Sequence, residues 1–249
     1  VLILGDTNSG MAAIVARRLG LPVYHMEAGN RCYDDRVPEE VNRLVTDVLA
    51  NLLWTPSPDG DENLRNEGIP AARIERVGNI MLDSYELQRQ RIEADGTFRQ
   101  LGLEPRRYGV VTLHRPSNVD DPATLGVLVE ALARVASDVP LVFPVHPRTR
   151  HRLAEAGLWE RLEAHPRLRL SPPVGYLDFT ALLLGARAVV TDSGGVQKEA
   201  YFNGIPCITL RDTTEWVETV EGGFNTLTGM DASAVRAALA DVTMPAERP

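Results

Sequence analysis

The run Asp192-Ser193-Gly194-Gly195-Val196-Gln197-Lys198-Glu199-Ala200 decides the fold, because a predicted buried strand precedes it and a predicted helix follows it. The apolar residues 186–191 predict the strand, and the pattern that ends near Gly204 predicts the helix. A strand, a Ser-Gly-Gly turn and a helix start form an anion site, since glycines admit a phosphate close to the backbone N–H groups. Glu199 lies about one turn into the helix, where its carboxylate can accept hydrogen bonds from sugar hydroxyls. The alternative is a tight turn in which Ser193 is only the helix cap.

Short apolar strands alternate with helical patterns along the whole chain, and this alternation predicts parallel sheets covered by helices. The predicted strands are 1–4, 23–25, 52–55, 74–77, 110–113, 141–145, 168–170, 188–191 and 207–210. The predicted helices are 10–19, 39–50, 59–66, 83–94, 122–137, 150–157, 176–184, 195–203 and a last one over 231–241. The fold class is therefore α/β.

The most polar and least strand-like interval runs from about residue 89 to 107, and we place a domain boundary there. The predicted domains are 1–95, the C-terminal part of a first Rossmann-like domain, and 96–225, a second Rossmann-like domain that carries the predicted anion site. A C-terminal helix and tail follow over 226–249. The first residues read as the middle of a sheet, so we expect the first domain to be incomplete in this chain.

Composition narrows the class of partners. The chain of 249 residues carries a formal net charge of −8, which argues against non-specific nucleic-acid binding. No apolar run is long enough to span a bilayer, and we expect no membrane partner. Cys32 and Cys207 fit no metal or redox spacing and suit buried thiols in a reducing compartment. With no signal-peptide pattern at the start, these observations predict a cytoplasmic protein.

Polar side chains gather where the predicted strands end, and ligands of open parallel sheets bind at the carboxyl ends of strands. These residues are Asp6, His25, Glu27, His114, Arg115, His146, Ser193 and Gly194. We expect two such domains to face each other across a cleft lined by these side chains.

Carboxylates cluster in the first part of the chain and are candidate acids and bases. Asp6 ends a strand, although it could simply cap the next helix. Glu39 and Glu40 follow Pro38 at a helix start, where they could only complement the helix dipole. Glu27 follows an apolar strand and needs a partner there.

Basic and polar residues recur later at strand ends. His114 and Arg115 suit a phosphate or a developing anion. His146 either contacts a ligand or only satisfies backbone before a helix. Arg211 could pair with a phosphate or with a catalytic carboxylate.

A further pair, Thr214 and Glu215, is expected to open the next helix, where both could be caps alone.

Together these motifs resemble the non-hydrolysing UDP-N-acetylglucosamine 2-epimerase family. The matching motifs, in the order of the family, are Gly5-Asp6-Thr7, Glu27-Ala28-Gly29, Pro38-Glu39-Glu40-Val41-Asn42-Arg43, Val77-Gly78-Asn79, His114-Arg115-Pro116-Ser117-Asn118, Ser193-Gly194-Gly195-Val196-Gln197 with Glu199, and Arg211-Asp212-Thr213-Thr214-Glu215. The resemblance implies a glycosyltransferase-B-like fold, with two Rossmann-type domains and the active site in the cleft. It covers nearly the whole chain.

The resemblance also implies a reaction, namely inversion at C2 of UDP-N-acetylglucosamine to give UDP-N-acetylmannosamine. The C2 proton is removed, UDP leaves C1, and UDP then recombines with the bound 2-acetamidoglucal while a proton reaches the opposite face. No cofactor and no metal are implied. The implied partners are the UDP-amino sugar and a second copy of the chain in a homodimer, and the implied destination is cell-envelope or capsular polysaccharide.

The resemblance also implies site residues, at the positions of this sequence that match the family's motifs. The matching catalytic residues are Asp6, Glu27, Glu39 and His114. The matching substrate and UDP ligands are Arg43, Arg115, Asn118, His146, Ser193, Gly194, Gly195, Glu199, Arg211, Thr214 and Glu215. Sequence does not assign which carboxylate takes the C2 proton.

Two departures from the family pattern keep alternatives open. The Gly-Thr-Arg-Pro-Glu motif that opens the family is absent here. The residues over 26–32 and 214–218 look more like those of relatives that epimerise other UDP-2-acetamido sugars, including 2,6-dideoxy and 2,3-diacetamido forms. The remaining alternatives are a hydrolysing 2-epimerase, a UDP-sugar glycosyltransferase, and a nucleotide-sugar-binding fragment without turnover.

Overall fold

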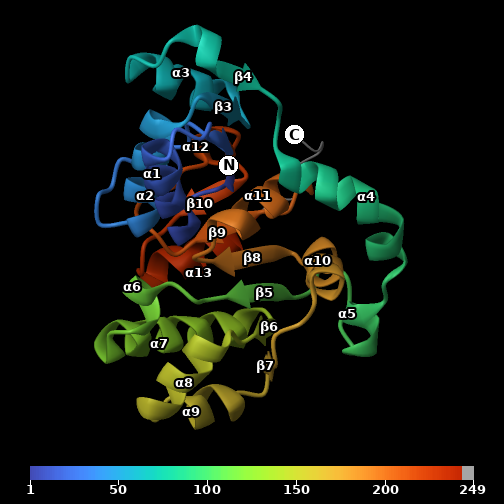
Figure 1. The fold of residues 1–249 in the computed structure, drawn as a ribbon. Helices are drawn as coiled ribbons and strands as arrows, with labels where there is room; N and C mark the ends of the chain where they lie inside the picture. The colour runs from blue at the N-terminus through green and yellow to red at the C-terminus, as the bar shows by residue number, and fades with distance from the viewer. Residues whose placement is uncertain (243–249) are drawn as a thin grey trace. The chain divides into compact units, whose positions relative to one another are not determined.

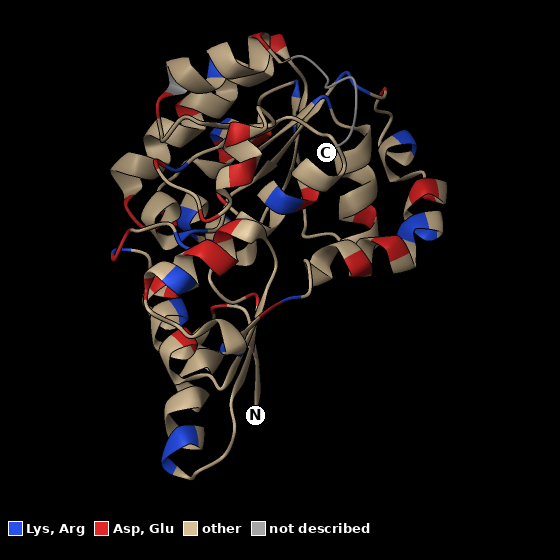
Figure 2. Cartoon of the chain, turned by 90° about the horizontal axis from the view of Figure 1, so that it is seen from above, with Lys and Arg blue, Asp and Glu red and all other residues tan. Residues whose placement is uncertain are grey.

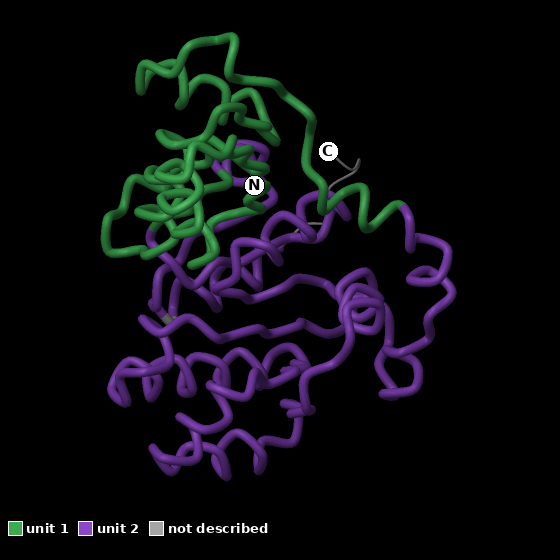
Figure 3. Tube along the Cα trace, in the orientation of Figure 1, with its two compact units in different colours: residues 1–86, 213–216 green, residues 87–212, 217–249 purple. Residues whose placement is uncertain are grey.

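The computed structural model describes residues 1–242 and divides the chain into two compact units (Figure 3). Unit 1 comprises residues 1–86 with 213–216, and unit 2 comprises 87–212 with the chain from 217 onward. The end of the predicted C-terminal tail, 243–249, lies outside the described residues. The predicted domain limits stay predictions.

Unit 1 contains a four-stranded parallel sheet with its strands in chain order, two of which are labelled in Figure 1. Its strands are β1 (Leu2–Leu4), β2 (Tyr24–Met26), β3 (Leu52–Thr55) and β4 (Ile74–Arg76). Its helices are η1 (Asn8–Met11), α1 (Ala12–Arg18), α2 (Pro38–Leu49), α3 (Pro58–Asn66), η2 (Ala71–Arg73) and the start of α4 (Ile80–Ala94). Ile3, Leu53 and Leu64 lie in its hydrophobic core. Asp6 and Glu27 follow the carboxyl ends of β1 and β2.

Unit 2 contains a six-stranded parallel sheet in the order β10-β9-β8-β5-β6-β7. Its strands are β5 (Gly109–Thr112), β6 (Leu141–Pro144), β7 (Leu168–Ser171), β8 (Ala188–Thr191), β9 (Cys207–Thr209) and β10 (Asn225–Leu227). Counted along the chain, this is the Rossmann order 3-2-1-4-5-6. The order reverses between β5 and β8, so the carboxyl ends of these strands mark the place where such sheets bind ligands.

Helices cover both faces of this sheet, which explains why its strands are continuous apolar runs. Val111 and Val190 face a core that α7, α8, α9 and α13 help to form. Val110 and Val189 face the opposite core, with α10 and α11. The helices of unit 2 are α5 (Thr97–Gln100), α6 (Pro116–Val119), α7 (Pro122–Asp138), α8 (Pro147–Glu155), α9 (Trp159–Glu163), α10 (Tyr176–Gly185), α11 (Gly194–Phe202), α12 (Val217–Glu221) and α13 (Ala232–Ala240).

The nine predicted strands are confirmed within one residue at each end. Strand β10 was not predicted, because three residues, Asn-Thr-Leu, carry no periodic signal. The helix expected from Thr214 is wrong, since α12 begins at Val217. Helix α8 begins three residues before its predicted start, because His146 caps it and Pro147 occupies its first position.

Charged residues of both signs are spread over the helices (Figure 2). Among residues 1–242, acidic and basic side chains are therefore interleaved, and no single helix carries the negative charge. Among residues 1–242, none of the helices combines the length and the apolar character needed to cross a bilayer.

Gly29 permits a close approach of two backbone segments in unit 1. Its φ is +82°, and a Cβ there would lie 2.3 Å from the carbonyl oxygen of Gly60. We expect Gly29→Ala to lower the free energy of unfolding by about 3 kcal/mol, from left-handed strain plus overlap. Gly68→Ala is the control, because Gly68 has a φ of +83° with nothing within 4 Å. It should cost about 1 kcal/mol, and equal losses in urea titrations of the two variants would contradict the overlap.

Candidate active site

Helix α2 holds Asp6 at both its backbone and its side chain. Asn42 donates its Nδ2 hydrogen to the Asp6 carbonyl at 2.9 Å, and Arg43 NH1 lies 3.3 Å from Asp6 Oδ2. The N-cap residue of η1 is Thr7, so the interpretation of Asp6 as a helix cap is wrong. Asp6 is instead an ion-paired carboxylate at the end of β1.

Four carboxyl groups form the acidic cluster of unit 1, namely Asp6, Glu27, Glu39 and Glu215. Burial raises the pKa of Asp6, the charges of Glu215 and Glu39 raise it further, and Arg43 opposes them. Burial also raises the pKa of Glu27, and the charge of Asp6 adds to this effect. A raised pKa makes a carboxyl group better able to hold and deliver a proton, as a general acid or base requires.

The backbone of Glu27 is itself unusual. Its φ of 67° lies in the left-handed region, which costs a non-glycine residue free energy. A Cβ at Gly5 would come within 3.3 Å of Glu27 Oε2, so the neighbouring turn leaves room for this carboxylate. Such outliers persist where surrounding contacts hold them, and they concentrate at functional sites.

Glu40 has a different role from the helix-dipole interpretation. Its side chain is buried and accepts hydrogen bonds from the N–H groups of Cys32 and Tyr33 at 3.0 and 3.1 Å. Its Oε2 also lies 3.3 Å from Arg43 NH2. Glu40 therefore ties the loop after β2 to α2 and orients the guanidinium that meets Asp6.

Thr214 and Glu215 lie in the segment 213–216, which belongs to unit 1 although it follows most of unit 2 along the chain. Both are about 8% exposed, and Thr214 Oγ1 accepts a hydrogen bond from the N–H of Trp216 at 3.1 Å. Glu215 thus joins the acidic cluster from a loop and not from a helix start.

In unit 2, the Ser-Gly-Gly turn adopts the predicted conformation. Ser193 is the N-cap of α11 and accepts a hydrogen bond from the N–H of Val196 at 3.4 Å. The helix begins at Gly194, and the first N–H groups of a helix have no acceptor within it. Capping by Ser193 and an anion site at the same turn are therefore compatible.

Asp192, just before this turn, organises the loop after β5. It is 0% exposed and accepts hydrogen bonds from the N–H groups of His114 and Arg115, at 3.0 and 2.9 Å. Asn118 donates to the same carboxylate at 3.3 Å and to the Leu210 carbonyl at 3.2 Å. Asn118 is thus an internal anchor here, and its contact with UDP stays a prediction. Asp192 was not among the predicted site residues.

The two candidate histidines lie side by side, with ring centroids 5.8 Å apart. His114 Nδ1 is 2.9 Å from Asp192 Oδ1, so Nδ1 carries the hydrogen and Nε2 of the neutral ring is left to accept a hydrogen bond. His146 caps α8, because its Nδ1 accepts a hydrogen bond from the N–H of Arg148 at 3.2 Å. Its Nε2 then carries the hydrogen and can donate to a ligand.

A hollow of about 300 Å³ lies at these strand ends, next to the point where the strand order reverses. Its lining residues are Thr112, Leu113, His114, Pro144, His146, Pro173, Val174, Phe179, Ser193 and Val196. Phe179, Val174 and Pro173 supply an apolar wall that was not predicted from the sequence. The one sequence signal that could have indicated these three residues is their position at or just before the start of the predicted helix 176–184.

The chain matches the model of the UDP-N-acetylglucosamine 2-epimerase family over residues 1–248. It belongs to this family. It is 45% identical over 234 residues to the UDP-2,3-diacetamido-2,3-dideoxy-D-glucuronate 2-epimerase of Pseudomonas aeruginosa. This match covers 92% of this chain and 63% of the relative. It is 41% identical over 236 residues to the UDP-N-acetylglucosamine 2-epimerase of Methanocaldococcus jannaschii, covering 92% and 64%.

A solved structure of the Methanocaldococcus jannaschii UDP-GlcNAc 2-epimerase in complex with UDP-GlcNAc and UDP matches with a TM-score of 0.92 at 38% identity. The match covers 100% of this chain and 70% of that chain. The fold is therefore the glycosyltransferase-B-like α/β fold of the epimerase family. This chain spans 63–66% of the length of the curated relatives that it matches.

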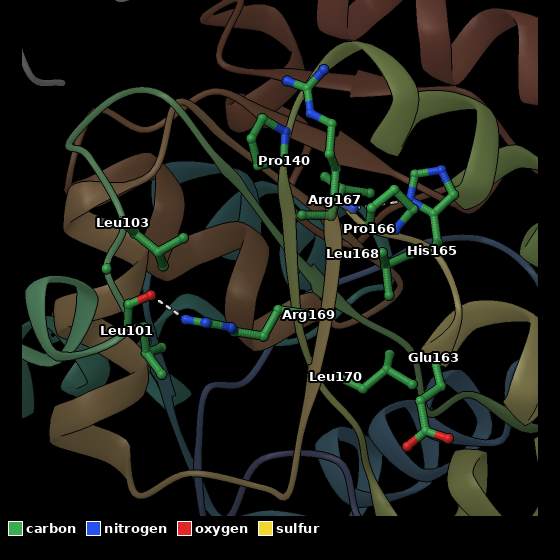
Figure 4. A pocket seen from close by; sticks show the side chains of 12 residues that line it. Leu101, Leu103, Pro140, Glu163, His165, Pro166, Arg167, Leu168, Arg169 and Leu170 are labelled. Atoms are coloured by element: carbon green, nitrogen blue, oxygen red, sulfur yellow. Dashed lines mark hydrogen bonds between the residues drawn. The ribbon is translucent and has the colours of Figure 1, made fainter.

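A larger hollow, of about 500 Å³, lies along the edge strand β7 and the start of β6 in unit 2 of this epimerase-family chain (Figure 4). Arginines there bind the carbonyl groups at helix ends: Arg169 donates to Leu101, and Arg167 donates to Ser137 at 2.8 Å. Cations at helix carboxyl ends complement the helix dipole. These contacts account for the arginines structurally, so this edge is not part of the candidate site.

Proposed function

We propose that the protein inverts C2 of a UDP-2-acetamido sugar, with UDP-N-acetylglucosamine to UDP-N-acetylmannosamine as the first candidate. The observation that carries this proposal is the acidic cluster of unit 1. Asp6 and Glu27 follow neighbouring parallel strands, and burial raises the pKa of both. Inversion requires one group that removes a proton and another that returns one, and a pair of such carboxyls supplies both.

The proposed reaction has two halves. A carboxylate of the acidic cluster takes the C2 proton while the C1–O bond to UDP breaks, which leaves 2-acetamidoglucal and UDP. UDP oxygen then re-forms the bond to C1, and a protonated carboxyl delivers a proton to the opposite face of C2. The atoms balance without a redox partner. We assign these transfers to Asp6, Glu27 and Glu39 as a group, and the charge of Arg43 limits the rise in the pKa of Asp6.

We assign UDP binding to unit 2. The start of α11 at Ser193, Gly194 and Gly195 suits the diphosphate, with His114 and His146 beside it. The hollow lined by Phe179 suits the uracil ring, and Glu199 suits the ribose hydroxyls. Further proposed contacts, carried by the family resemblance alone, are Arg115, Asn118, Arg211, Thr214 and Glu215.

A second candidate substrate is UDP-2,3-diacetamido-2,3-dideoxy-D-glucuronate. The observation in its favour is the 45% identity to the relative named for that substrate, against 41% for a relative named for UDP-N-acetylglucosamine. Both substrates share the 2-acetamido group and the C2 hydrogen, so the reaction class does not depend on the choice. The homodimer and the cytoplasmic location stay predictions.

The test is incubation with each UDP-sugar in D₂O, followed by proton NMR. Deuterium at C2 together with the C2 epimer establishes the reaction, and the sugar that exchanges faster is the preferred substrate. Free N-acetylmannosamine with UDP would instead identify a hydrolysing enzyme. Sugar transfer to an acceptor without deuterium at C2 would identify a transferase and contradict the proposal.

The binding of UDP should depend on pH through Glu199. Burial raises the pKa of Glu199 to about 7. Ribose hydroxyls donate to the ionised carboxylate, so lowering the pH protonates the group in the free protein and weakens binding. We expect UDP affinity to fall about tenfold from about pH 8 to about pH 6, measured by calorimetry. The terminal phosphate of UDP also titrates near pH 6, so Glu199→Gln serves as the control. An identical pH dependence in both proteins would contradict the role of Glu199.

A further inference from the structure

His25 lies inside unit 1, on β2, and is 0% exposed. Its Nδ1 is 2.6 Å from Asp47 Oδ1, and its Nε2 is 3.0 Å from the carbonyl oxygen of Gly5. A carbonyl oxygen and an ionised carboxylate only accept hydrogen bonds. A ring between two acceptors satisfies both only when each nitrogen carries a hydrogen, which makes it an imidazolium.

The surroundings of Asp47 keep its carboxylate ionised. Asp47 Oδ2 accepts a hydrogen bond from the N–H of Gly29 at 3.1 Å and lies 2.7 Å from Arg31 NH2. Arg31 in turn donates two hydrogen bonds to Glu67, both at 2.7 Å. Both donors reach Oδ2 and favour an ionised carboxylate, so the hydrogen between Oδ1 and His25 Nδ1 belongs to the ring.

Charge balance gives the same result. With His25 protonated, the network holds two cations, His25 and Arg31, and two carboxylates, Asp47 and Glu67. With a neutral ring, it would hold one unbalanced negative charge among side chains of which three are 0% exposed. Burial of an unbalanced charge is costly, so the protonated ring is the stable form.

The His25 ring is linked to the proposed catalytic carboxyls through Gly5 and through its charge. Gly5 has a φ of +66°, donates its N–H to the Met26 carbonyl at 3.0 Å and accepts from His25, so both of its peptide groups are tied to β2. Asp6 is the next residue. The charge of His25 also favours the ionised form of Glu27, with Arg43 acting in the same sense and Asp6 against it.

We propose that His25 is a permanently protonated positioning residue, a buried imidazolium that fixes the turn carrying Asp6 and favours the ionised form of Glu27. It would act through these carboxyls and touch no substrate. The consequence for catalysis rests on the proposed function, whereas the protonation state of the ring does not.

The first test uses the unaltered, ¹⁵N-labelled chain and long-range ¹H–¹⁵N correlation of its five histidine rings. We expect one ring to keep both nitrogens protonated from about pH 6 to about pH 8.5, and its signals to be absent from His25→Gln. A His25 ring with one unprotonated nitrogen at pH 8 overturns the proposal.

The second test follows the Glu27 carboxyl by ¹³C NMR. His25→Gln keeps an N–H donor for the Gly5 carbonyl but removes the charge, so we expect the Glu27 titration midpoint to move upward by about one pH unit. His165→Gln, on the half-buried histidine after α9, is the control and should leave it unmoved. An unmoved midpoint in folded His25→Gln overturns the proposal.

If His25→Gln fails to fold, the ring measurement on the unaltered chain still decides. Neither readout needs turnover, so a chain that epimerises no UDP-2-acetamido sugar would contradict the proposed function alone.

Discussion

Glu27→Gln and Asp6→Asn are each expected to lower the rate of C2 deuterium exchange by at least about 10²-fold while UDP still binds. Each change removes a proton-transferring group and keeps its size. Arg43 would lose one of its two charged partners, Asp6 and Glu40, in Asp6→Asn, so Glu27→Gln is the cleaner variant. It also keeps the left-handed backbone at this position, and the comparison therefore isolates the charge. Exchange at a near-normal rate in both variants would contradict the assignment.

Glu62→Gln on α3 is the matched control, because Glu62 is exposed in the same unit. It should leave the rate of C2 deuterium exchange unchanged.

The thermal stability of Glu27→Gln supplies a second readout. The folded-state pKa of Glu27 is raised, so folding favours the protonated form, and the wild-type protein loses stability as the pH rises from the unfolded-state pKa through the folded-state one. Glu27→Gln avoids this loss, so it should unfold at a higher temperature than wild type near pH 8, with the difference vanishing below about pH 4.

Asp192→Asn is expected to lower the free energy of unfolding by about 3 kcal/mol and to weaken UDP binding at least about tenfold. The carboxylate is fully buried and accepts hydrogen bonds from His114, Arg115 and Asn118. An amide would turn an NH₂ group toward at least one of these donors. The loop that carries His114 would then lose its anchor. Urea titration and calorimetry with UDP measure the two effects.

Asp121→Asn is the control for the same chemical change. Asp121 is exposed and accepts one helix-capping hydrogen bond, from the N–H of Thr124 at 2.8 Å. It should cost at most about 1 kcal/mol and leave UDP affinity unchanged. An Asp192→Asn protein that matches this control would show that Asp192 does not organise the site.

The elements of the fold were predictable because they depend on local pattern. The run before Asp192 is apolar on both faces and thus reads as a strand of a doubly covered sheet. Ser193 with two glycines marks the following helix start by local chemistry. Strand β10 is too short for such a signal, and the segment 213–216 contains cap-forming residues that tertiary contacts hold in a loop instead.

The candidate site was predictable only where strand ends display a polar residue. Asp6, Glu27 and His114 are visible in this way. The roles of Asp192, Glu40 and the pair His25–Asp47 were not predictable, although His25 and Asp192 also stand at strand ends, since their partners lie between 7 and 78 residues away along the chain. Buried polar side chains are chosen by the partners that packing brings to them, and one sequence does not reveal those partners.

The return of the segment 213–216 to unit 1 has a consequence for biosynthesis. A growing chain folds largely from its amino end, unit by unit. Unit 1 cannot be completed before unit 2 is synthesised, because Glu215 leaves the ribosome only after all of residues 87–212. The last carboxyl of the acidic cluster therefore arrives when the proposed nucleotide-binding unit already has its Ser-Gly-Gly turn. A nascent chain would therefore form the proposed UDP-binding turn of unit 2 before the acidic cluster of unit 1 is complete.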